Sequence, residues 1–292
     1  MEDDKISREI AKGTRQAGKS YSFDEAHDEQ QPASWWFQES PEGLVLFVIF
    51  YTMACRWSRC LGCNLPSLMS QKHVPYQALM AQVDHLLAVP EVVRRSPAIR
   101  KVIVSNNGSV LDQETFSSTA LMYLLARLNS QLPALCVLTL ETRPEYVEWT
   151  ELEFISRALQ ENTPPATLEL AVGFEAFDDD IRNRVFGKGL ALETFERLVK
   201  DAAPYGYRIK CYFMQKPVPD LGDDDAVADI HRGIDYLARL AAGHRVGFNL
   251  HLNPTYVARG TRLEKDFASG AYVPPRLRDV ARAALHARAK NL

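Results

Sequence analysis

The stretch LVLFVIFYTMACRWSRCLGCNLPS, residues 44–67, decides how the rest of the chain is interpreted. It begins with nine residues that are almost all aliphatic or aromatic, a composition typical of a buried strand. Three of the chain's five cysteines then follow within nine positions, at Cys55, Cys60 and Cys63. In folds with parallel strands, functional groups gather in the loops that follow the strands. The stretch therefore indicates a functional site directly behind a buried strand.

Five further segments have the same strand-like composition, and apolar residues at helical spacing follow them. The expected strands are residues 44–52, 99–106, 134–141, 167–175, 207–214 and 245–252. The expected helices are residues 76–89, 113–131, 149–162, 190–206, 224–241 and 274–292. Nearly continuous apolar strands that alternate with helices predict an α/β fold with a parallel sheet covered by helices, either an open doubly wound sheet or a full or partial barrel.

The composition is that of a globular protein, with 46% hydrophobic and 24% charged residues among 292. Polar residues at the amino terminus predict a loosely held arm, residues 1–40, before a core domain of residues 41–292. The net charge of −3 gives no general attraction to nucleic acid or anionic lipid. The apolar run of residues 43–54 is too short to span a bilayer, and the first residues lack the apolar core of a secretion signal. We therefore expect a cytoplasmic protein.

The three clustered cysteines follow the spacing C-x4-C-x2-C. An odd number of cysteines in a reducing compartment argues against a disulfide framework, which leaves metal binding or catalysis. A zinc site would need a fourth ligand, for which His73 is the nearest candidate. Three thiolates on one loop can instead hold three irons of an iron–sulfur cluster, and a redox dithiol would use only the last two cysteines. The isolated Cys136 and Cys211 are expected to be core thiols.

Several motifs besides the cysteines occur in a fixed order along the chain. They are TMACRWSRCLGC (52–63), NNGSVLD (106–112), LETRPEY (140–146), VGFEAFDDDIRNRVFGKG (172–189) and HLNPTYVARGTRLE (251–264). In this order they resemble the radical S-adenosylmethionine (SAM) enzymes, in the branch of the elongator catalytic subunit, oxygen-independent coproporphyrinogen oxidase and the radical SAM subunit of archaeosine synthesis. The archaeosine-type group is the most similar. The resemblance implies a partial (β/α)6 barrel of parallel strands with outer helices.

The resemblance also implies the cofactors. Cys55, Cys60 and Cys63 would hold a [4Fe–4S] cluster, and SAM would bind its open iron. An electron from a low-potential donor of the flavodoxin or ferredoxin type would then split SAM into methionine and a 5′-deoxyadenosyl radical, which takes a hydrogen atom from the substrate. This chain departs from the family in two ways: four residues rather than three separate the first two cysteines, and Gly62 replaces an aromatic residue that usually contacts adenine.

By the same resemblance, the expected SAM-binding residues end or follow the strands; they are Gly108, Ser109, Asp112, Glu141, Glu175 and Lys188. Each has a structural alternative. Asp112 could be a helix N-cap, and the two glutamates could form ion pairs with Arg143 or Lys188. The glycines that flank Lys188 leave its ammonium accessible to the SAM carboxylate, but Lys188 could also be an ordinary surface lysine near a helix end. The candidates for substrate contact and catalysis are Arg143, Tyr256 and Arg259.

The substrate is not specified by these motifs. The acidic isoelectric point and the lack of an appended RNA-binding domain favour a small molecule or peptide, whereas the archaeosine-like motifs suggest a tRNA nucleoside. A basic terminal helix could contact RNA or be solvated; its charged residues are Arg276, Arg278, Arg282, Arg288 and Lys290, against the single acid Asp279. A third hypothesis is a non-catalytic binding module with a zinc-stabilised loop.

Overall fold

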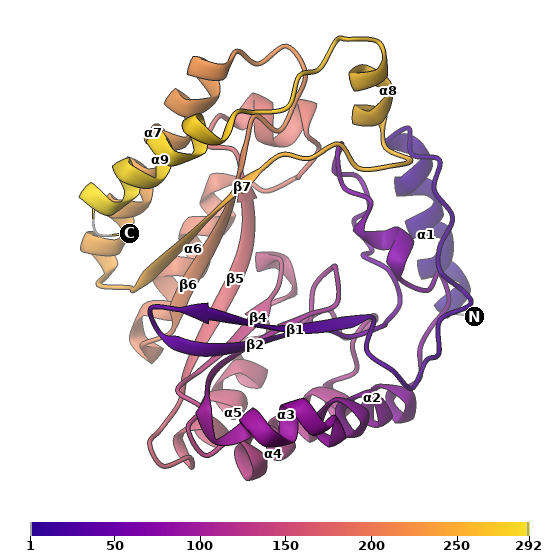
Figure 1. The fold of residues 1–292 in the computed structure, drawn as a ribbon, viewed down its shortest axis with the longest axis vertical. Coiled ribbons are helices and arrows are strands. Elements are labelled where there is room, and N and C mark those ends of the chain that lie inside the picture. Colours follow the sequence, from indigo (N-terminus) through magenta and orange to yellow (C-terminus); the bar gives the residue numbers. More distant parts are fainter. Residues whose placement is uncertain (1, 291) are drawn as a thin grey trace. The chain divides into compact units, whose positions relative to one another are not determined.

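The structure, a computed structural model, describes residues 2–290 and residue 292. Met1 of the expected arm and Asn291 of the expected last helix lie outside the described residues. The strands form one sheet in the order β1-β2-β3-β4-β5-β6-β7. Figure 1 labels most of them. Their bounds are β1 Ser34–Ser40, β2 Gly43–Ile49, β3 Ile99–Ser105, β4 Val137–Glu141, β5 Thr167–Glu175, β6 Arg208–Gln215 and β7 Phe248–Pro254.

In the sequence, most of the helices lie between successive strands. They are α1 Glu2–Gln16, α2 Tyr76–Ala88, α3 Pro90–Arg95, α4 Ser118–Gln131, α5 Trp149–Gln160, α6 Leu192–Ala202, α7 Asp223–His244, α8 Arg262–Ala268 and α9 Leu277–Ala289. A π-helical turn, Asp180–Val185, follows β5. Among the described residues, no helix combines the length and the apolar character that crossing a membrane requires.

The strand pairing confirms the expected α/β fold with the topology of a partial (β/α)6 barrel. Parallel pairs join β2 to β3, β3 to β4 and β6 to β7, and all strands follow one another in sequence order. All six expected strands are present, with ends that differ by a few residues. The prediction missed β1, which pairs antiparallel with β2 and stacks Trp36 on Phe47 with ring centroids 4.3 Å apart.

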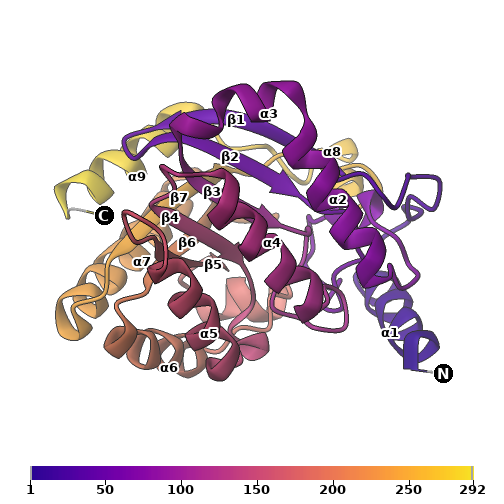
Figure 2. The ribbon, with the colours of Figure 1, turned by 90° about the horizontal axis from the view of Figure 1, so that it is seen from below.

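The chain forms two compact units. The first unit comprises Met1–Ala11, Ser22–Arg56 and Leu65–Leu170. Within it, α2 lies beside α4 and α4 beside α5, along β2 to β4 (Figure 2). A buried ion network connects its strands: the ammonium of Lys101 lies 2.6 Å from Glu169 and 2.7 Å from Glu42, and the hydroxyl of Thr139 donates to Glu169 at 2.9 Å.

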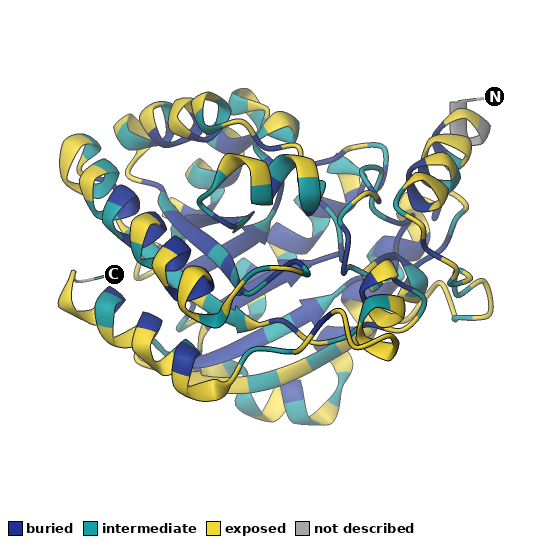
Figure 3. Ribbon diagram, turned by 90° about the horizontal axis from the view of Figure 1, so that it is seen from above, coloured by how far each residue is buried: buried dark blue, intermediate teal, exposed yellow. Residues whose placement is uncertain are grey.

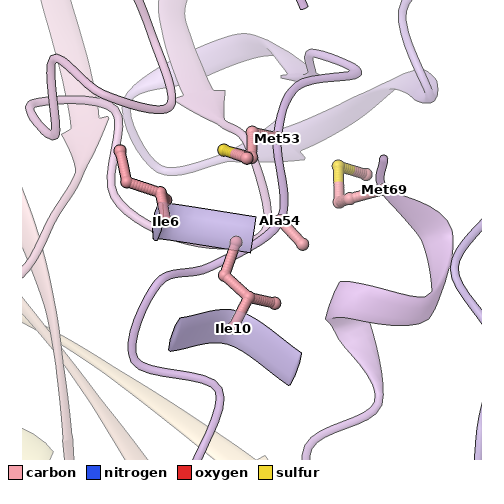
Figure 4. Close-up of a cluster of buried hydrophobic side chains, with 5 residues drawn as sticks. All are labelled: Ile6, Ile10, Met53, Ala54 and Met69. Atoms are coloured by element: carbon pink, nitrogen blue, oxygen red, sulfur yellow. The ribbon is translucent and has the colours of Figure 1, made fainter. Parts of the chain in front are cut away.

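Ile6 and Ile10 of α1 are packed more firmly than the polar composition of the amino-terminal segment predicts. Ile6 and Ile10 are buried against Met53, Ala54 and Met69, so the start of the helix contacts the segment just before Cys55 (Figure 4). The expectation of a loosely held arm overlooked this contact, because only two apolar residues of α1 make it. The division into an arm of residues 1–40 and a core of residues 41–292 stays a prediction.

The second unit comprises Lys12–Tyr21, Trp57–Asn64 and Ala171–Leu292. One face of β6 packs on α7: a Cβ added to Gly233 would lie 2.5 Å from Phe213, whose ring also stacks on Phe174 at 5.0 Å. Helices α7 and α9 contact each other and expose their outer faces (Figure 3). The helix-facing residues of β6 therefore form an apolar core in this unit.

Candidate functional site

Gly108 lies against Cys55 in the first unit. A Cβ added to Gly108 would be 3.2 Å from the Cα of Cys55 and 3.3 Å from its Cβ, which is tighter than nine in ten real Cβ contacts. The preceding Asn107 has a φ of 56°, a left-handed conformation that costs a non-glycine residue energy and is common at functional sites. The loop after β3 thus touches the cysteine segment.

Ser109 connects two of the motif loops. Its hydroxyl is 2.6 Å from the hydroxyl of Thr142 and accepts a hydrogen bond from the backbone N–H of Arg143 at 3.3 Å. The backbone N–H of Val110 donates to the carbonyl of Glu141 at 2.8 Å. These bonds hold the loop after β3 against the loop after β4, so Ser109 has a structural role in addition to any ligand contact.

Asp112 forms an ion pair with Arg56, the residue directly after Cys55. The two side chains are 2.7 Å apart, and the carboxylate is only 3% exposed. Burial raises the pKa of Asp112 although Arg56 lowers it. The Arg56 guanidinium also lies 5.0 Å from the ring centre of Tyr146, whose pKa burial raises to about 12. The sequence analysis did not select Arg56 or Tyr146 as site residues. Arg56 could have been selected because it directly follows Cys55.

The structure decides whether Asp112 is the N-cap of the helix that follows it. Helix α4 is capped by Ser117, whose hydroxyl accepts a hydrogen bond from the N–H of Thr119 at 3.2 Å, so Asp112 is not its N-cap.

Arg143, a candidate for substrate contact, is buried and forms an ion pair with Glu145. Glu141 is half-buried at the end of β4. A cavity of about 600 Å³ opens beside the Arg56–Asp112 pair in this unit.

Cys60 and Cys63 belong to a tight turn of the second unit. The backbone N–H of Cys63 donates to the carbonyl of Cys60 at 3.2 Å, and the N–H of Leu61 donates to the carbonyl of Phe186 at 2.7 Å. Leu61 and Phe186 are buried in one apolar cluster, with Cys60 partly buried against it. A four-residue turn brings its first and last residues within about 7 Å of each other, so both thiols start from one short segment.

Gly62 has a physical reason to replace the aromatic residue of the family. A Cβ added to Gly62 would lie 3.3 Å from the Cδ2 atom of Leu263, which is buried at the start of α8. The neighbouring side chain therefore occupies the direction in which a larger residue would extend. Leu263 of α8 therefore lies in the space beside Gly62.

Glu175 and Lys188 meet at the carboxyl end of β5. The ammonium of Lys188 is 2.8 Å from the carboxylate of Glu175, which confirms the ion pair considered as an alternative. Glu175 has a φ of 68°. A Cβ added to Gly173 would lie 2.2 Å from the carboxylate and 2.4 Å from the ammonium, so this glycine makes room for the pair.

Arg182 fixes the loop that carries Lys188. Its fully buried guanidinium donates to the carbonyls of Phe177 at 2.7 Å, Leu190 at 2.8 Å and Ala176 at 3.1 Å. Burial lowers the pKa of Arg182. The backbone N–H of Lys188 donates to the carbonyl of Arg182 at 2.9 Å. Sequence reasoning missed this arginine, because a charged residue between two others in DIRNRV looks like a solvated helix position.

The remaining candidates are more peripheral within the second unit. Tyr256 and Arg259 are exposed. Partial burial raises the pKa of Tyr256, and the charge of nearby Cys63 adds to that shift. The guanidinium of Arg276, the residue before α9, lies 2.6 Å from the carboxylate of Asp223. On α9 itself, the guanidinium of Arg282 lies 2.9 Å from the carboxylate of Asp224. The predicted basic face of the terminal helix is therefore largely compensated by acids of α7.

All five cysteines lie in the described part of the chain, and no disulfide bond joins any of them. Cys55 belongs to the first unit, whereas Cys60 and Cys63 belong to the second. Within residues 2–290 and 292, no group of three or more His, Cys, Asp or Glu side chains is arranged to hold a metal ion. His73, the candidate fourth zinc ligand, is exposed.

Comparison with known proteins supports the archaeosine-type resemblance. The chain is 29% identical over 248 residues to the archaeosine synthase subunit beta of Methanosarcina acetivorans, covering 83% of this chain and 67% of that protein. It is 23% identical over 237 residues to the archaeosine synthase subunit beta of Thermococcus kodakarensis, covering 80% and 68%. The resemblance to the archaeosine-type group is therefore confirmed. No family model matches the chain.

Among solved structures, queuine lyase from Clostridium spiroforme, bound to SAM and queuine, is similar to the chain. The sequence identity is 17%, the TM-score is 0.48, and the match covers 81% of this chain and 89% of that one. Since this score is low, the fold assignment depends on the strand order and pairing of the chain itself.

Proposed function

We propose that the protein is a radical SAM enzyme in which Cys55, Cys60 and Cys63 hold a [4Fe–4S] cluster. The observation that carries the proposal is the close contact between Gly108 and Cys55, because it connects the cysteine segment to the loop expected to bind SAM. The similarity to archaeosine synthase subunits supports the same assignment.

The chemistry of the three cysteine side chains suits such a cluster. Three partly buried thiols offer the soft sulfur ligands that iron–sulfur clusters need. Cys60 and Cys63 share one hydrogen-bonded turn, and Cys55 follows a segment whose apolar side chains are packed against α1. When bound, the cluster would supply the electron that splits SAM and so produces the 5′-deoxyadenosyl radical.

The chain's own residues would bind and orient SAM. Lys188, held in a loop fixed by Arg182, offers a cation for the SAM carboxylate. Glu175, now paired with Lys188, and Glu141 provide oxygen atoms for the SAM amino group or ribose hydroxyls. Asp112 acts through Arg56, which it keeps beside Cys55. Gly108 allows the close backbone approach that a bound ligand and a cluster both require.

The proposal is tested by anaerobic reconstitution with iron and sulfide, followed by incubation with SAM and dithionite. The wild type should take up about four irons and four sulfides per chain and release 5′-deoxyadenosine. Cys60→Ala should lose both properties, whereas Cys136→Ala, a matched control outside the cysteine loop, should keep both. A wild type that takes up zinc but no iron or sulfide would favour the zinc-stabilised binding module instead.

For the substrate we propose a tRNA nucleoside, because both named relatives are archaeosine synthase subunits. A small molecule or peptide is the second candidate, favoured by the net charge of −3. Since the relatives are named as subunits, we infer that a partner chain takes part in tRNA binding. Retention of tRNA that weakens steeply with salt would support the first candidate. Radical transfer to a small molecule or peptide without tRNA would support the second.

A further inference from the structure

The glycines on either side of Lys188 receive the cysteine loop. Gly187 and Gly189 have φ angles of 79° and 64°, which favour glycine. A Cβ added to Gly187 would lie 2.9 Å from the carbonyl oxygen of Arg59, and one added to Gly189 would lie 2.2 Å from the indole of Trp57. The absence of a side chain at these two positions therefore allows the segment around Lys188 to contact residues 57–59.

Trp57 makes the central contact between the two segments. Its indole N–H donates a hydrogen bond to the carbonyl of Gly187 at 2.7 Å. The guanidinium of Arg59 lies 4.8 Å from the indole ring centre. Two residues further on, the backbone N–H of Leu61 donates to the carbonyl of Phe186 at 2.7 Å. Residues 57–61 thus contact residues 186–189 at several successive points, all within the second unit.

The backbone of Trp57 is also held from its other side. A Cβ added to Gly13 would lie 2.9 Å from the carbonyl oxygen of Trp57. The buried ammonium of Lys19 donates to the carbonyl of Ser58 at 2.9 Å, and Ser58 has a left-handed φ of 45°. Both the backbone of Trp57 and its indole therefore make contacts within the second unit.

From these contacts we propose that Trp57 is a positioning residue for Lys188. The lysine side chain is a flexible stem with a point charge, so the place of its ammonium depends on the place of its backbone. Trp57 fixes the residues directly before and after Lys188, and it belongs to the same loop as Cys60 and Cys63. The four-residue gap between Cys55 and Cys60 is the segment that contains this tryptophan. The proposal rests on the proposed function, in which Lys188 binds the SAM carboxylate.

A first experiment needs no cofactor. In Trp57→Phe, which keeps an aromatic ring but loses the indole donor, the Leu61 amide should exchange hydrogen for deuterium at least several-fold faster than in the wild type. Gly189→Ala adds a methyl group that would displace the indole of Trp57, and it should have the same effect. Trp36→Phe, a matched change on β1 in the first unit, should leave this exchange unchanged. Wild-type exchange rates at Leu61 in both loop variants would overturn the proposal.

A second experiment measures SAM binding to the reconstituted protein by equilibrium dialysis. We expect Lys188→Met to weaken binding about tenfold or more, which corresponds to ~1.4 kcal/mol. Trp57→Phe should weaken binding by a smaller factor while iron content stays at the wild-type level. If Trp57 acts through Lys188, the double variant should bind no more weakly than Lys188→Met alone.

Each contrary result has a separate meaning. Additive losses in the double variant would overturn the positioning role, as would a loss of iron in Trp57→Phe, because the tryptophan would then act on the cysteines. A reconstituted wild type that binds no SAM would overturn the proposed function and, with it, the role toward SAM. The exchange experiment on the cofactor-free protein would still show whether Trp57 holds the loop.

Discussion

The ammonium of Lys188 lies 2.8 Å from the carboxylate of Glu175, and the two side chains are only 12% and 13% exposed. The pair joins the end of β5 to the loop that Arg182 fixes. A carboxylate ligand arriving at Lys188 must therefore share the ammonium with Glu175 or displace it. Removing Glu175 should free the lysine for such a ligand, but it also removes a group proposed to bind the amino end of SAM.

The first prediction concerns the stability of this pair. Lys188→Met should lower the free energy of unfolding by about 1–3 kcal/mol, because a largely buried carboxylate loses its cation. The double variant Glu175→Gln with Lys188→Met should recover part of the loss. Urea unfolding measures both values. Arg157→Ala, which breaks the much more exposed pair with Glu153, should change stability by less than about 0.5 kcal/mol and serves as the control.

The second prediction concerns the space beside Gly62. Gly62→Phe should destabilise the protein by about 1–3 kcal/mol, because the new side chain meets buried Leu263. Combining it with Leu263→Ala should cost less than the sum of the two single changes, since the smaller residue gives the ring room. Thermal unfolding of the four proteins tests this coupling. Strictly additive losses would contradict the proposed contact.

The third prediction concerns the ion network of the first unit. Lys101→Met should cost about 3–5 kcal/mol, because Glu169 is fully buried and would lose its ammonium partner. Lys101→Met with Glu169→Leu should be more stable than Lys101→Met alone, since the buried charge is then gone as well. Urea unfolding of both variants decides the matter. Equal stability of the two would show that the carboxylate is compensated in another way.

The fourth prediction concerns pH and the contact between α7 and α9. The rings of His231 and His286 stack at 4.2 Å, and His286 lies 3.0 Å from Asp235. Burial, and then the charge of His286, lowers the pKa of His231. The other charged groups near this site are Arg282 on α9, Lys290 just after α9, and Asp235 on α7, whose negative charge acts in the opposite direction.

Because the folded protein holds this proton less tightly than the unfolded chain, stability should fall as the pH drops below the unfolded value of about 6.5. The fall should continue down to the lower pKa of the folded state. Unfolding measured at several pH values should show this loss in the wild type and a smaller loss in His231→Gln. An identical pH profile in the variant would assign the effect to other groups.

The strands could be predicted because each is a short apolar run between polar loops, as in other buried parallel sheets. Strand β1 was missed because SWWFQES alternates polar and aromatic residues at an edge of the sheet, where burial is only partial. The places of the motif loops also followed from this alternation of strands and helices. Individual contacts did not, because pairs such as Arg56 with Asp112 join residues that lie 56 positions apart.

The candidate site residues also divide into those that the sequence could indicate and those that only the structure reveals. Glycine at 108 and lysine at 188 could be selected from motif order, whereas the roles of Trp57 and Arg182 depend on backbone carbonyls that no side-chain pattern reveals. For Glu175 and Lys188 the sequence left open both SAM binding and an ion pair with each other. The distance between the two groups shows that they form the ion pair in this structure.

The contact between Gly62 and Leu263 has a consequence for evolution. The two positions are about two hundred residues apart in the chain, yet a larger side chain at position 62 requires the side chain at position 263 to shift. Homologues that keep an aromatic residue before the last cysteine should therefore carry a smaller residue at the start of the equivalent helix, and the two sites should covary. A search pattern that requires the aromatic residue would pass over chains that have made this exchange.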